Sequence, residues 1–177
     1  MKTDHKIIIG VIILTIILVV AVSLFGEKEE TIEQKRLSNE LVGEKIVEMK
    51  SPHIKIGESH EPYNSNPPTS GPHIGNDVAG AGIKDQPVAD ELVVHSLEHG
   101  AVVLWYRDGI SQKDLEILKK VFKEASGKKI MMPRRDMDTP IALTSWNYLL
   151  KLETVDEVKI KEFIETNSDR APEKAPI

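Results

Sequence analysis

The chain has 177 residues, 23 basic against 28 acidic side chains and a formal net charge of −5. This length suits one domain with appended segments, and the acidic balance argues against a nucleic-acid partner. The absence of cysteine excludes disulfides, thiolate metal sites, iron–sulfur clusters and a cysteine nucleophile.

Residues 1–26 predict a single membrane anchor. Residues 7–25 form an apolar run, which at about 1.5 Å rise per residue just spans a hydrocarbon core of about 30 Å. Lys2 and Lys6 precede the run and acidic residues follow it, which favours a cytoplasmic N-terminus. The small residues at 21–23 leave a cleaved signal peptide open as an alternative. We expect a single-pass protein of the cytoplasmic membrane with its C-terminal domain outside the cytoplasm.

After the anchor, residues 27–50 are charged and carry apolar side chains at helical spacing, which predicts a helical stalk or linker. The globular domain is expected over residues 51–170, and residues 171–177 are expected to be a loose tail. Within the domain, residues 53–56 alternate as a short strand does. Residues 57–82 are rich in Gly, Pro, Ser and Asn, so they predict one long loop, which in a compact domain is often functional.

The second half of the domain combines strand and helix signals. Four segments are expected to be strands: residues 92–95, 101–106, 129–132 and 140–146. The second of them is apolar on both faces and should be central. Capping boxes at residues 111–114 and 154–157 open two helices. The fold class predicted is α+β, with a small, mostly antiparallel sheet, two flanking helices and the long Pro/Gly-rich loop, in addition to the N-terminal transmembrane helix.

The histidines are the strongest functional signal, because five of the six lie between residues 53 and 99. Imidazole is the commonest metal ligand in proteins and titrates near neutral pH. His60 and His73 lie on the proline-rich loop, where prolines fix the backbone and form a stiff arm before His73. The supporting residues of this arm are Tyr63, Pro67, Pro68, Ser70 and Gly71.

The segment from His95 to His99 reads His-Ser-Leu-Glu-His. In a helix its two histidines share one face, a spacing that zinc-binding helices use. The pattern also matches the inverted zinc-peptidase motif. That activity needs a long helix, whereas Gly100 and the strand expected behind it leave room for one turn. Glu98 is expected to be a further ligand or a partner that orients a ligand.

The metal candidates are His60, His73, His95 and His99, together with Glu98. Nitrogen donors without thiolate suit copper or zinc, thioethers favour Cu(I), and carboxylates near the histidines would favour zinc or another divalent ion. Copper is placed slightly ahead of zinc, and Met132 is an outside candidate for a ligand, although methionines in a strand are more often core filling.

Two long motifs resemble a known family. They are Tyr63-Asn-Ser-Asn-Pro-Pro-Thr-Ser-Gly-Pro-His73 and Val94-His-Ser-Leu-Glu-His-Gly-Ala-Val-Val-Leu-Trp-Tyr106. They resemble the prokaryotic domain-of-unknown-function family 3105, whose members typically carry an N-terminal membrane segment and an exported domain. The resemblance covers about residues 50–173 and supplies no established activity. It implies that the five metal candidates are signature positions and leaves His53 outside the signature, so His53 is not included in the candidate site.

The function expected is that of a membrane-anchored extracytoplasmic metal-binding protein, acting in metal handling or delivery rather than catalysis. One alternative is an extracytoplasmic metal-dependent hydrolase that uses the same cluster. The other is a metal-free interaction module that binds a partner through the proline-rich loop.

Overall fold

The computed structural model describes residue 38 and residues 40–177. The predicted anchor and most of the predicted stalk lie outside these residues. Among the residues described, none belongs to a helix that is both long and apolar enough to cross a membrane.

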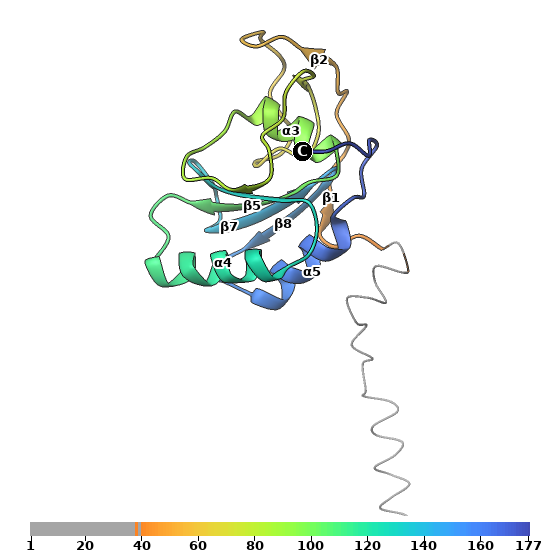
Figure 1. Cartoon of the computed structure of the whole chain (residues 1–177). Coiled ribbons are helices and arrows are strands. Elements are labelled where there is room, and N and C mark those ends of the chain that lie inside the picture. Colours follow the sequence, from red (N-terminus) through yellow and green to blue (C-terminus); the bar gives the residue numbers. More distant parts are fainter. Residues whose placement is uncertain (1–37, 39) are drawn as a thin grey trace, which may run out of the picture. The chain divides into compact units, whose positions relative to one another are not determined.

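The described residues form an α+β fold with three helices, as Figure 1 shows. In chain order the elements are β1 (Glu44–Lys45), β2 (His53–Ile54), β3 (His73–Ile74), β4 (Gly82–Ile83), α3 (Asp90–Glu98), β5 (Val102–Arg107), α4 (Gln112–Glu124), β6 (Lys129–Arg134), β7 (Ile141–Ser145), β8 (Tyr148–Leu152) and α5 (Glu157–Asn167).

Six strands form one mixed sheet in the order β1-β8-β7-β5-β6-β4. The pairs from β1 through β8 and β7 to β5 are antiparallel. The pairs of β6 with β5 and with β4 are parallel. The expected α+β class is thus confirmed, but the sheet is antiparallel on one side only. A separate parallel pair, β2 with β3, lies outside this sheet.

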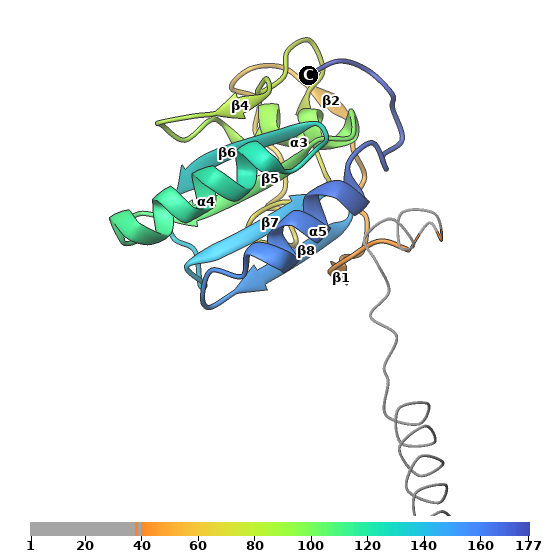
Figure 2. The same cartoon turned by 60° about the horizontal axis from the view of Figure 1, so that its bottom comes forward.

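Both faces of the sheet are buried, and the two faces carry different helices. Helices α4 and α5 cover one face and α3 covers the other (Figures 1 and 2). The side chains of β5 alternate between the hydrophobic cores on the two faces of the sheet. Val102 and Leu104 pack with the α4–α5 side, whereas Val103 and Trp105 pack with the α3 side. The prediction of a central strand buried on both faces is confirmed.

Polar caps set the starts of α4 and α5. The Ser111 side chain accepts a hydrogen bond from the Asp114 backbone N–H, as the first capping box predicts. The second helix begins later than predicted, because Asp156, not Thr154, is the N-cap and accepts from the Lys159 N–H. The chain bends at residues 153 and 154 after β8, and Asp156, which is extended, caps the helix.

Residues 92–95 were expected to be a strand, and this prediction is wrong. They belong to α3, a nine-residue helix with Asp90 and Glu91 in its first turn. Val93, Val94 and Leu97 are fully buried against the sheet, and their i, i+1, i+4 spacing follows one face of a helix. Two adjacent valines favour a strand by propensity, but the packing of this face outweighs that preference.

The two ends of the described region join the domain. Glu44 and Lys45, in the segment predicted as a helical stalk, pair with β8 as an edge strand. Residues 171–177, the expected loose tail, lie against the end of α3. Here the Glu173 N–H donates to the Glu98 carbonyl at 3.1 Å, and Lys128 Nζ donates to the Ala175 carbonyl at 2.9 Å.

Candidate metal centre

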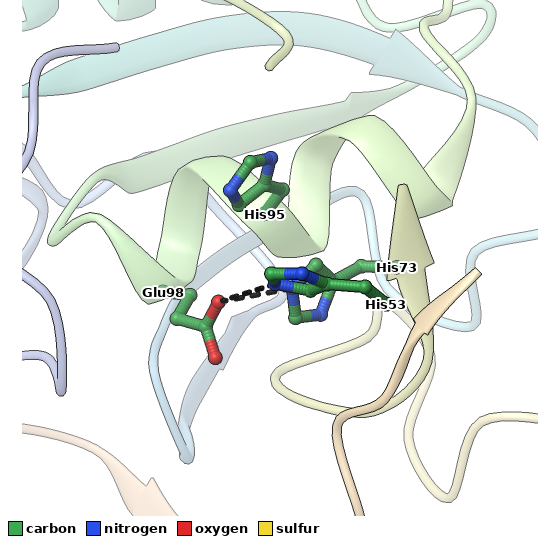
Figure 3. Close-up of side chains that lie close together, drawn as sticks. All are labelled: His53, His73, His95 and Glu98. Carbon is green, nitrogen blue, oxygen red and sulfur yellow. Dashed lines mark ion pairs between the residues drawn. The ribbon is translucent and has the colours of Figure 1, made fainter. Parts of the chain in front are cut away.

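Four side chains converge above the α3 face of the sheet: those of His53, His73, His95 and Glu98 (Figure 3). One ligand atom from each lies within 4.8 Å of the others. A tetrahedral zinc shell with bonds of about 2.0–2.1 Å places its donor atoms about 3.4 Å apart. The group therefore needs only a small contraction to surround one ion. His53 comes from β2, His73 from β3, and the other two from α3.

His73 is held by the proline-rich arm, which packs into the domain rather than lying on its surface. Pro67, Pro68 and Ser70 are buried, and Ser70 Oγ accepts from the Met49 N–H at 3.0 Å. The Tyr63 hydroxyl donates to the Pro72 carbonyl at 2.7 Å. The Asn66–Pro67 peptide bond is cis. The arm thus presents His73 from a fixed backbone.

Gly71 orients the His73 ring. Its φ of +123° is a conformation that favours glycine, and a Cβ at this position would lie 3.0 Å from the Tyr63 ring. In this conformation the Gly71 carbonyl accepts a hydrogen bond from His73 Nδ1 at 3.0 Å. The bond fixes the tautomer and leaves the Nε2 lone pair directed at the group.

His95 is fixed in the same way from the opposite side. Its Nδ1 donates to the Asp77 carbonyl at 2.7 Å, which also leaves Nε2 as the free nitrogen. The loop that carries Asp77 is tied to α3, because Ser96 Oγ accepts from the Ala79 N–H at 2.9 Å. Metal-ligating histidines characteristically donate their second nitrogen to a carbonyl or carboxylate in this manner.

Two buried atoms in the group lack a hydrogen-bond partner. His73 Nε2 and Glu98 Oε2 lie 2.9 Å apart, yet neither makes a hydrogen bond within the described structure. With the His73 proton on Nδ1, a nitrogen lone pair faces a carboxylate. With the proton on Nε2 instead, the Nδ1 lone pair would face the Gly71 carbonyl. Either tautomer of the neutral ring leaves one repulsive contact, and a cation between the two atoms removes it.

Protonation of His73 would also remove the repulsion, but burial opposes it. The His73 side chain is fully buried, and this desolvation lowers the pKa of His73 from its usual value. The Gly71 carbonyl and the Glu98 carboxylate raise the pKa, whereas the neighbouring His95 and His53 lower it further, and the net effect is a lowered pKa. The ring is therefore neutral at pH 7, which is the form that binds metal ions.

The structure brings together three of the five predicted ligands: His73, His95 and Glu98. His60 lies elsewhere, with Nε2 at 3.3 Å from Glu91 Oε1 and Nδ1 at 2.7 Å from the Glu61 carbonyl. It is therefore in a hydrogen-bonded pair outside the group.

His99 also lies outside the group, although it touches one of its members. It is the C-cap residue of α3, and its ring packs edge-on against the His95 ring with centroids 4.3 Å apart. Its Nδ1 lies 2.9 Å from the Pro176 carbonyl and its Nε2 lies 3.3 Å from Glu173 Oε2. His99 thus connects the tail to His95.

His53, which the sequence analysis left out, is the fourth member of the group. It is paired in register with His73 across the β2–β3 pair, and its Nε2 lies 3.9 Å from Glu98 Oε2. The sequence carries only a weak sign of this pairing, because the dipeptide His-Ile at 53–54 and again at 73–74 is too short to predict a strand pair. Two short strands of equal pattern can pair and bring their histidines together.

Met132 lies away from this group. It is fully buried and packs in the core between α3 and the sheet. Its thioether therefore acts as core filling, and the donor atoms of the group are nitrogen and oxygen.

A cleft of about 590 Å³ beside the arm is lined by Tyr63, Trp105 and Arg134, among others. The charge of Arg134 is already paired within the domain. Its guanidinium pairs with Asp90, and its Nε donates to Asn66 Oδ1 at 2.8 Å. These contacts fasten the start of α3 to β6 and so help to hold His95 and Glu98 in place.

Comparison with known protein families gives a match. The profile of the family described as "Protein of unknown function (DUF3105)" matches residues 53–176. The curated proteins give no significant match, and neither do the solved structures.

Proposed function

The chain belongs to the DUF3105 family, whose description assigns no activity, and we propose that it binds one divalent transition-metal ion at the group of His53, His73, His95 and Glu98. The observation that carries this proposal is the pair of buried atoms His73 Nε2 and Glu98 Oε2, which lie 2.9 Å apart and make no hydrogen bond. Buried polar atoms are normally satisfied. A metal ion would satisfy both, and the two Nδ1–carbonyl bonds already direct the nitrogens toward it.

We propose Cu(II) or Zn(II) as the ion. Three imidazoles and one carboxylate suit borderline divalent ions, whereas Cu(I) is favoured by thiolate and thioether donors. The chain has no cysteine, and Met132 lies in the core. These facts support the oxidised form of copper over the reduced one.

Metal handling or delivery is better supported than hydrolysis. Catalytic zinc sites usually have three protein ligands and an open position for water, whereas four donors converge here. Glu98 is itself one of the four, so in this arrangement it is a ligand and not a base free to activate water.

The apolar run at residues 7–25 and the basic residues before it support a location outside the cytoplasmic membrane, with the domain tethered by a single anchor. This part of the proposal is tested in a bacterial expression host. The full chain should stay in the membrane fraction after carbonate extraction, and its domain should be digested by protease added to spheroplasts. Recovery in the soluble fraction, or protection from protease, would contradict it.

Metal binding is tested on the full chain purified in mild detergent. We expect one Cu(II) or Zn(II) per chain at micromolar concentration and neutral pH, measured by competition with a chromophoric chelator and by elemental analysis. The His73→Ala/His95→Ala double variant should bind none. His60→Ala is the matched control, because it removes a histidine outside the group and should bind one ion. Failure of the unmodified chain to bind Cu(I), Cu(II) or Zn(II) would refute the proposal.

A further inference from the structure

The four proposed ligands are not equivalent in their exposure. The side chain of His73 is fully buried, and that of Glu98 is 11% exposed. His95 is also buried. The His53 side chain is 57% exposed. Three donors are therefore buried together, and the fourth, that of His53, lies between them and solvent.

His53 is also held less firmly than the other histidines. His73 and His95 each donate Nδ1 to a backbone carbonyl. In the described part of the chain the polar partner of the His53 ring is Glu98, at 3.9 Å. β2 itself has two residues, and among the described residues it pairs with β3 alone. Rotation of the His53 side chain would thus break no hydrogen bond.

The exposed side of the ring opens onto a groove of about 630 Å³, lined by residues of the 53–56 and 75–76 segments. Gly75 makes room for the ring, because a Cβ there would overlap His53 Cγ and lie 2.5 Å from Nδ1. The groove thus reaches His53 before any of the buried donors. A small chelator or a donor group of another protein can approach the ion from this side.

We infer that His53 is the exchange ligand of the site, through which the ion enters and leaves. In this step the bond between the ion and the His53 imidazole breaks as a bond to an incoming nitrogen, oxygen or sulfur donor forms. The oxidation state of the ion does not change, and the displaced imidazole returns to water as a neutral ring. His73, His95 and Glu98 hold the ion until further donors of the acceptor replace them. This inference rests on the proposed metal binding and adds its route of transfer.

Stopped-flow transfer tests the inference on the full chain in detergent, loaded with one equivalent of Zn(II) and mixed with a chromophoric chelator. The His53→Gly variant should still bind one ion, because three buried donors remain. It should release the ion at least about tenfold faster, since even partners that only orient a ligand are worth about 10–100-fold in affinity. Added imidazole, which can enter through the groove, should slow the release again.

Two controls separate an exchange ligand from other roles. His60→Gly also removes an imidazole and should release zinc at the rate of the unmodified chain. His73→Gly should lose stoichiometric binding, and imidazole should not restore it, because the position is buried. The inference is overturned if His53→Gly releases zinc at the unmodified rate, if it retains no zinc, or if imidazole has no effect on its release. Absence of zinc from the unmodified chain would instead refute the proposed function.

Discussion

Replacement of Glu98 by glutamine should change metal affinity and metal-free stability in opposite directions. The substitution keeps the shape of the side chain but replaces a carboxylate oxygen by an amide group. Glu98 Oε2 lies 2.9 Å from His73 Nε2, and both atoms are buried without a hydrogen-bond partner. In the Glu98→Gln variant the amide can donate to the His73 lone pair. A repulsive contact is thereby replaced by a hydrogen bond.

The magnitude follows from the cost of leaving such groups unpaired. A buried polar group without a partner costs about 1–3 kcal/mol, so the metal-free variant should gain about 1–2 kcal/mol. For a domain of this size that corresponds to a rise of about 3 °C in Tm for each kcal/mol. The same change removes an anionic ligand, and the affinity for Zn(II) should fall by about tenfold or more, as it does even for residues that only orient ligands.

Thermal unfolding with and without zinc measures both effects. The metal-free Glu98→Gln variant should melt at a higher temperature than the unmodified chain. Added zinc should raise the Tm of the unmodified chain strongly, because a ligand at about 100 times its Kd adds about 2.7 kcal/mol, and should raise that of the variant much less. Glu91→Gln is the control, since Glu91 lies on the same helix but pairs with His60. A less stable metal-free Glu98→Gln variant, or undiminished zinc binding by it, would refute the reasoning.

Three further predictions follow from the contacts around the group. Gly75→Ala should displace the His53 ring, so stopped-flow release of zinc should be faster while the Tm of the metal-free chain changes little; an unchanged release rate would contradict this. Glu173→Gln removes the charge that faces His99 at 3.3 Å, and His99 in turn packs against the His95 ring. The His95 ring should therefore be held less firmly, and the zinc affinity measured by chelator competition should fall by up to about tenfold. Equal affinity would show that the tail has no such role. Burial lowers the pKa of His73 in the fold, so the unfolded chain takes up a proton first as pH falls through about 6.5. The unfolding free energy of the metal-free chain, from urea titrations, should therefore be highest above that pH and decrease below it, with a smaller decrease in His73→Gln; equal slopes would contradict this.

The sequence predicts best those elements whose residue pattern is compatible with a single secondary structure. Residues 101–106 are apolar on both faces and become the central strand β5. Ser111 is followed by a helix-forming amphipathic segment and becomes the N-cap of α4. In both cases local propensity and tertiary packing agree, so no knowledge of distant contacts is needed.

Helix α3 shows where this agreement fails. Val93 and Val94 favour a strand as isolated residues, but the face that they form with Leu97 is buried under the sheet. The burial of that face depends in part on residues of β6 and β7, such as Ile130 and Ala142, which are distant from α3 in the sequence. The single turn expected at residues 95–99 is enough to place Glu98 beside His95, but the sequence does not predict that both lie at the end of a nine-residue helix.

The ligands that could be predicted from the sequence are those that lie within a recognisable motif. His73, His95 and Glu98 lie in the two long motifs, and the structure brings them together. His53 joins them through a strand pair between residues that are 20 positions apart, and neither two-residue strand has a pattern strong enough to predict that pair. His60 and His99 have the right residue type, but their nitrogens already face the carboxylates of Glu91 and Glu173.

The central claim is that His53, His73, His95 and Glu98 together bind one ion. X-ray absorption spectroscopy of the full chain loaded with one equivalent of Zn(II) tests it most directly. The account predicts a four-coordinate shell of nitrogen and oxygen at about 2.0–2.1 Å with the outer-shell scattering of three imidazoles. One imidazole should be lost in His53→Gly and none in His60→Gly. A shell with sulfur, a shell with fewer than three imidazoles in the unmodified chain, or the loss of an imidazole in His60→Gly would contradict the account.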